Sequence, residues 1–77
     1  MVKCSIKQES NGFTVVVHNE KTGYRLVGET YEPKRGPFGT SPAEFEAARQ
    51  RAIADAKDWT AKFRQAGIKA ETVEVVS

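Results

Sequence analysis

Residues 2–18 read VKCSIKQESNGFTVVVH, and this stretch decides the fold. Apolar and polar side chains alternate along residues 2–7 with the two-residue period of a half-buried strand. The Asn-Gly pair at 11–12 is a strong hairpin signal, because both residue types tolerate positive φ. Residues 13–18 then continue the apolar face on a second strand, with Phe, Val and Val at alternate positions. The stretch therefore predicts an antiparallel hairpin.

The chain downstream of this hairpin predicts a third strand and then a loop. A polar turn at residues 19–23 ends in a glycine and leads into a strand over residues 24–31. On this strand Tyr24 and Leu26 are expected to face inward. The pattern stops at residues 32–40, where two prolines and two glycines break any regular element. Three strands with short turns predict an antiparallel meander, followed by an exposed loop.

The next segment carries the signals of one long amphipathic helix. Ser41 is a suitable N-cap, Pro42 suits the first helical position and Glu44 the third. Apolar residues then recur every three or four positions as far as residue 66. Gly67 follows, where a left-handed C-cap is expected. Residues 68–76 have the pattern of a closing strand.

The element order β-β-β-α-β predicts an α+β fold in a single domain spanning residues 1–77. One long helix covers one face of the meander, and a right-handed crossover makes the C-terminal strand parallel to the first, in the spatial order 3-2-1-4. This layout resembles a reduced ribonuclease-H-like sheet, and small HicB-type antitoxins have a similar one. The resemblance rests on the order of elements and on Gly12-Phe13 at the start of the second strand. The proline-rich turn expected of that family after the second strand is missing.

The predicted helix is longer than the strands that it covers. Residues 42–66 span about 37 Å as a helix, whereas a strand of six to eight residues spans roughly 20–27 Å. The helix is therefore expected to overhang the sheet or to kink. An overhang would leave an aromatic end partly uncovered, at Phe45 or at Trp59 and Phe63, and would favour a dimer or a partner contact.

Composition narrows the class of protein. The chain has 77 residues, of which 39% are hydrophobic and 29% charged, too apolar for a disordered segment and too polar for a membrane protein. No apolar run approaches the roughly 20 residues that cross a bilayer, and residues 1–5 lack the apolar stretch of a signal peptide. A single cysteine, Cys4, allows no internal disulfide and no cysteine-based metal cluster. We therefore expect a cytoplasmic protein without a metal or cofactor.

The sheet face opposite the helix is the best candidate for function. Lysine and arginine side chains there could follow phosphates while an aromatic residue stacks on bases, although a solvated face normally carries such residues to stay soluble. The net charge of +2 is small for a nucleic-acid-binding protein. In the loop, Phe38 is expected to pack back near Phe45 unless it binds something. The predicted partner-binding residues are Lys3, Lys7, Arg25, His18, Tyr31, Lys34, Arg35 and Phe38.

Catalysis is not expected. His18 and Ser5 share one face, but Asp55 and Asp58 belong to the helix on the other side of the sheet and cannot complete a triad through it. We therefore interpret the chain as a non-enzymatic interaction module of the kind that small bacterial or phage genes encode, with an unknown protein partner. A nucleic-acid-binding domain using the same basic face is the alternative. A homodimer through an edge strand or the helix overhang is compatible with either.

Overall fold

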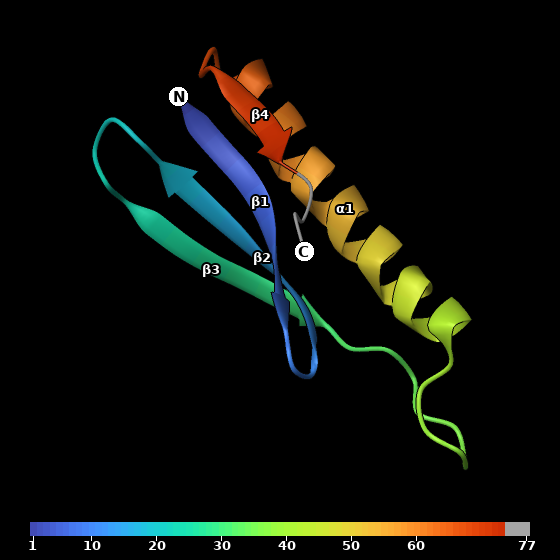
Figure 1. Cartoon of the computed structure of the whole chain (residues 1–77). Helices are drawn as coiled ribbons and strands as arrows, with labels where there is room; N and C mark the ends of the chain where they lie inside the picture. The colour runs from blue at the N-terminus through green and yellow to red at the C-terminus, as the bar shows by residue number, and fades with distance from the viewer. Residues whose placement is uncertain (74–77) are drawn as a thin grey trace.

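The computed structural model describes residues 1–73 as a four-stranded sheet with one helix packed on one face (Figure 1). The strands lie in the order β3-β2-β1-β4, with β1 antiparallel to β2 and parallel to β4. The predicted α+β class, strand order and parallel last strand are confirmed. The predicted strand positions 74–76 lie outside the described residues. The elements are β1 (Val2–Glu9), β2 (Gly12–Asn19), β3 (Arg25–Tyr31), α1 (Pro42–Gln65) and β4 (Ala70–Val73).

The β1–β2 hairpin forms as predicted, but its turn differs from the expected one. Glu9 pairs with Gly12, so Ser10 and Asn11 form the two-residue turn. Both have negative φ, and the positive φ of +156° belongs to Gly12, the first residue of β2. A Cβ on Gly12 would lie 2.3 Å from the backbone oxygen of Tyr31. The glycine therefore lets β3 approach the end of the hairpin.

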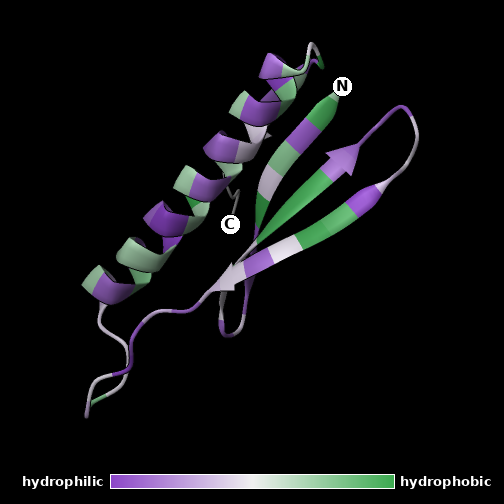
Figure 2. Cartoon of the chain, turned by 180° about the vertical axis from the view of Figure 1, so that it is seen from behind, coloured by the Kyte–Doolittle hydropathy of each residue, from purple (hydrophilic) through white to green (hydrophobic). Residues whose placement is uncertain are grey.

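The core lies between α1 and the inward face of the sheet. Ala48, Ala52 and Ala56 recur every fourth residue on α1 and are fully buried against a layer that includes Cys4 and Val15. Because alanine is the smallest side chain that still favours a helix, this stripe brings the helix backbone close to the strands. Figure 2 shows the alternation of hydrophobic and hydrophilic residues along β1 and the more continuous hydrophobic run of β2.

The two ends of α1 are closed as the sequence predicts. The Ser41 hydroxyl accepts a hydrogen bond from the Glu44 amide at 3.2 Å, which forms the N-cap. At the C-terminus Gly67 has a φ of +79°. The Ile68 amide donates to the Phe63 carbonyl at 2.9 Å, in the Schellman arrangement. These caps end the helix abruptly enough for the chain to turn directly into β4.

Large aromatic side chains fill the space near both ends of α1. Phe45 meets the buried Phe13 edge to face, with ring centroids 5.2 Å apart. Trp59 and Phe63 stack on each other with centroids 6.0 Å apart. Phe45, Trp59 and Phe63 are all half-buried, so part of each ring stays accessible; the overhang of the helix remains a prediction.

A β-bulge in β3 changes which side chains face the helix. Val16 pairs with Val27 and Thr14 with Thr30, so the two residues Gly28 and Glu29 stand opposite the single residue Val15. The extra residue reverses the alternation beyond it. Thr30 consequently lies on the outer face, and the residue after it turns inward.

Two predictions about β3 are therefore wrong. Tyr31, expected on the outer face, packs against the core because the bulge reverses the alternation before it. Tyr24, expected to face inward, precedes the first residue of β3 and is 64% exposed. Leu26 does pack against the core as predicted.

Replacing Gly12 with alanine should destabilise the protein by about 2 kcal/mol or more, because the new Cβ meets backbone and the φ suits only glycine. Gly23, with a φ of +76°, has nothing within 4 Å of the corresponding position, so Gly23→Ala should cost only about 1 kcal/mol. Urea unfolding of both variants measures the difference. An equal loss of stability in the two variants would contradict the role of Gly12 in letting β3 approach the end of the hairpin.

The alanine stripe of α1 should be sensitive to added volume. Ala52→Leu should lower the free energy of unfolding by about 1–3 kcal/mol, because the larger side chain must push the helix from the sheet. Ala54 lies two residues away on the exposed side of α1, and Ala54→Leu should change stability by no more than about 0.5 kcal/mol. Thermal or urea unfolding compares the two variants, and a tolerated Ala52→Leu would show that the helix packs loosely.

Candidate functional site

Three of the predicted partner-binding residues form a row across the outer face of the sheet. Lys3 of β1 pairs with His18 of β2, which in turn pairs with Arg25 of β3. Because the pairs are directly opposite, the three side chains lie on the same face. Lys7 lies two outward positions further along β1 and is exposed. The outward placement of these four residues is as predicted.

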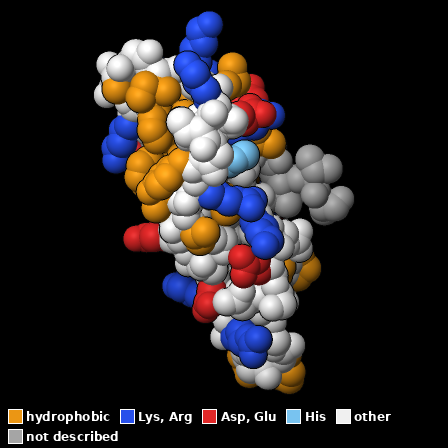
Figure 3. Space-filling model, turned by 90° about the vertical axis from the view of Figure 1, so that its left-hand side faces the viewer, with side chains coloured by type: hydrophobic (Ala, Val, Ile, Leu, Met, Phe, Trp, Pro, Cys, Tyr) orange, Lys and Arg blue, Asp and Glu red, His pale blue; other side chains and the backbone are white. Residues whose placement is uncertain are grey.

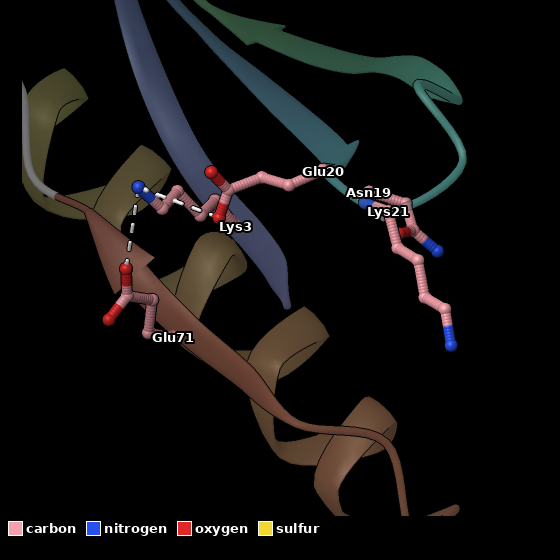
Figure 4. A network of polar contacts seen from close by, with 5 residues as sticks. All are labelled: Lys3, Asn19, Glu20, Lys21 and Glu71. Carbon is pink, nitrogen blue, oxygen red and sulfur yellow. Dashed lines mark hydrogen bonds and ion pairs between the residues drawn. The ribbon is translucent and has the colours of Figure 1, made fainter.

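The charge of this row is partly balanced by carboxylates. The Lys3 ammonium lies 3.6 Å from a carboxylate oxygen of Glu20 and 3.8 Å from one of Glu71 (Figure 4). Figure 3 shows basic, acidic and hydrophobic side chains interspersed over this side of the molecule. The arrangement lacks the continuous positive stripe that would track a phosphate backbone.

The middle of the outer face is closed rather than open to water. Thr14 and Val16 of the inner strand β2 are only 2% and 5% exposed. The hydroxyls of Thr14 and Thr30 lie 2.9 Å apart, and the Ser5 hydroxyl donates to the Val16 carbonyl at 3.3 Å. Val16, although it lies on the outer face, is therefore not available for contact with a partner. Val27, on the edge strand β3, is an exposed apolar residue of this face, at 66%.

The side chain of Tyr31, the last residue of β3, extends towards α1. Its hydroxyl donates a hydrogen bond to the Asp55 carboxylate of α1 at 3.0 Å. Burial, together with the hydrogen bond to Asp55 and the nearby carboxylates of Asp55 and Glu29, raises the pKa of Tyr31 to about 12. Tyr31 borders an open hollow of about 280 Å³. This β3–α1 hollow is lined by Gly28, Glu29, Tyr31, Asp55, Trp59 and Lys62.

The segment of residues 32–40, called the Phe38 loop below, ends in a tight turn. The Gly36 amide donates to the Gly39 carbonyl at 2.8 Å, and the Gly39 amide donates to the Gly36 carbonyl at 3.2 Å. Pro37 occupies the turn position where its fixed φ is favourable. Figure 1 shows the loop reaching beyond the sheet and the start of α1.

Phe38 sits at the tip of this turn and is 102% exposed. The prediction that it packs near Phe45 is wrong for two reasons. The glycine pair closes the turn on itself, away from the helix, and the ring of Phe13 already packs against Phe45. Lys34 and Arg35 precede the turn, and their side chains are exposed too.

The predicted residues therefore do not form one site. Arg25 begins β3 and Tyr31 ends it, so the Lys3–His18–Arg25 row and the start of the Phe38 loop are about 20 Å apart along the strand. The loop residues Lys34, Arg35 and Phe38 form a second, separate group. The β3–α1 hollow was missed, because no site between β3 and α1 was predicted. Gly28 inside a strand pattern was the signal that could have indicated the bulge behind it.

The residues considered for catalysis and metal binding are not brought together. Ser5 pairs with Val16 and His18 with Lys3, while Asp55 lies beneath the opposite face. Among residues 1–73, no group of three or more His, Cys, Asp or Glu side chains is placed to hold a metal ion. Within the same residues, no helix is both long and apolar enough to cross a bilayer.

Comparisons with known proteins found no match to any protein-family model, curated protein or solved structure. The resemblance in element order to HicB-type antitoxins therefore gains no support from them. A function for this chain has to be argued from its own surface.

Tyr31→Phe should lower the free energy of unfolding by about 1 kcal/mol at neutral pH by removing the hydrogen bond to Asp55. Because the folded-state pKa is raised from 10.0 to about 12, the stabilisation by the neutral phenol is fully present below about pH 10. It is lost as the pH rises towards 12. The difference between wild type and Tyr31→Phe, measured by urea unfolding, should therefore shrink in this range. Tyr24→Phe, at an exposed position, is the control, and a constant difference would argue against the Tyr31–Asp55 bond.

Proposed function

We propose that the chain is a non-enzymatic module that binds a protein partner through the Phe38 loop. The observation that carries the proposal is the complete exposure of Phe38 at the tip of a closed turn. A phenyl ring in water is unfavourable, and its burial in a partner would contribute roughly 1.5–3 kcal/mol. Aromatic anchors of this kind dominate the binding energy of many protein interfaces.

The turn also lowers the cost of binding. The two hydrogen bonds between Gly36 and Gly39, together with the fixed φ of Pro37, order the backbone before any partner arrives. Less conformational entropy is therefore lost on association than for a flexible loop. Lys34 and Arg35 stand next to the turn, so a partner with an apolar pocket and an acidic rim suits the loop best.

Nucleic-acid binding through the outer sheet face is less well supported. Lys3 is shared between Glu20 and Glu71, and Tyr31, the proposed stacking residue, is turned towards α1. The remaining cations of the face, Lys7 and Arg25, lie on different strands. In the proposal the protein works in the cytoplasm, where the free and buried thiol of Cys4 stays reduced.

Site-specific photo-crosslinking in cells of the source organism tests the proposal. The photoreactive amino acid p-benzoylphenylalanine replaces Phe38 in one variant and Tyr24, another exposed aromatic residue, in a control. Irradiation should give discrete protein adducts from position 38 and few from position 24. Position 38 should lose most of its adducts when Lys34 and Arg35 are changed to glutamate.

Two results would count against a protein partner. The first is an equal and diffuse pattern of adducts from both positions. The second is binding of mixed DNA or RNA oligonucleotides that shifts backbone amide signals across β1–β3 and weakens steeply as salt is raised. That pattern would instead favour the nucleic-acid alternative, and Lys7→Ala with Arg25→Ala should then weaken binding.

A further inference from the structure

The β3–α1 hollow has the chemistry of a receptor for an aromatic side chain. Trp59 and Tyr31 contribute aromatic rings to its lining, and Gly28 contributes no side chain. The hollow measures about 280 Å³ and is open to the surface. A second aromatic ring could pack against both rings without displacing a core residue.

The rim of the hollow is acidic. Glu29, which the bulge places at the rim, and Asp55 both line it, and within residues 1–73 neither forms an ion pair. Lys62 is the cation among the lining residues. Its ammonium is 3.1 Å from the Asp58 carboxylate and 5.8 Å from the centre of the Trp59 ring, so its charge is already balanced. Unlike Lys62, Glu29 is left with no basic partner.

The Phe38 loop has the complementary properties. Its tip carries a fully exposed phenyl ring, and Lys34 and Arg35 lie a few residues before it. The loop reaches away from the body of its own molecule (Figure 1). An aromatic tip with basic neighbours therefore matches an aromatic hollow with an acidic rim.

We propose that the partner of the Phe38 loop is a second copy of this chain, with Phe38 seated between Tyr31 and Trp59 and Arg35 close to Glu29. The proposal rests on the proposed function, because it names the partner for the same loop. Each copy carries both halves of the contact, so two such insertions related by a two-fold axis close a dimer.

The structure disfavours two other routes to a homodimer, pairing along the β3 edge and contact through Phe45. The bulge at Gly28-Glu29 makes the edge strand β3 irregular, and the strand carries the exposed charged side chains of Arg25 and Glu29, as in edge strands protected from pairing. At the N-terminal end of α1, Phe45 is already packed against Phe13. Insertion of the loop into the hollow requires neither strand pairing at the β3 edge nor a contact with Phe45.

Trp59 is the single tryptophan of the chain, so its fluorescence reports directly on the hollow. Raising the protein concentration from micromolar to about 1 mM should shift its emission to shorter wavelength while sedimentation equilibrium shows a dimer. Phe38→Ala should weaken this association at least tenfold, as expected for an aromatic anchor. Tyr24→Ala, the matched exposed control, should leave the association unchanged.

Charge reversal tests the pairing of loop and hollow. Arg35→Glu and Glu29→Arg should each weaken the dimer, and the double variant should recover most of the lost affinity, because the attraction is restored with its sign exchanged. Circular dichroism confirms that each variant is folded.

Three results would overturn the second-copy proposal: wild-type protein that stays monomeric to about 1 mM, association that survives Phe38→Ala, or a double variant no better than the singles. Photo-crosslinking separates this failure from that of the proposed function. If position 38 forms adducts with a different protein and this chain stays monomeric, the second-copy proposal is wrong. The proposed function of the Phe38 loop as a protein-binding element then still holds. An adduct of twice the chain mass supports both.

Discussion

Close packing of one alanine stripe against the sheet is the constraint on which the rest of this structure depends. Ala48, Ala52 and Ala56 are fully buried, so α1 lies near the strands and a small domain gains a dense core from a single helix. The same arrangement covers one face alone. In the described residues the outer face has no helix packed on it. Its own side chains, such as Thr14 and Thr30, must therefore shield the central strand β2 from water.

The bulge in β3 has effects well beyond the strand itself. It turns Tyr31 towards Asp55 and sets Glu29 at the rim of the β3–α1 hollow. It also makes the edge strand β3 irregular, where an uninterrupted strand would invite pairing with other chains. One extra residue thus contributes Glu29 to the lining of the hollow, turns Tyr31 towards α1 and makes the edge strand irregular.

The sequence was sufficient for features that depend on neighbouring residues. Alternation along residues 2–7, the cap at Ser41 and the glycine at position 67 predicted the strands, the helix and, through the crossover rule, the sheet order. It was insufficient where the outcome depended on residues far apart. Tyr31 was misplaced because the bulge shifts the register of β3 by one residue, and the alternation of side chains alone does not show that shift. Phe38 was misplaced because its expected position was occupied by Phe13, and the balance on Lys3 depends on Glu20 and Glu71 from two other segments.

The turn between Gly36 and Gly39 is held together by its own backbone and by proline, and its tip makes no contact with the core. Its tip residue can therefore vary without disturbing the packing beneath. Folding and recognition are carried by separate parts of the chain, so relatives with the same scaffold could acquire different partners through changes at this tip. Such a protein can change what it binds while its stability stays nearly constant, which makes the turn a natural position for grafting new recognition sequences.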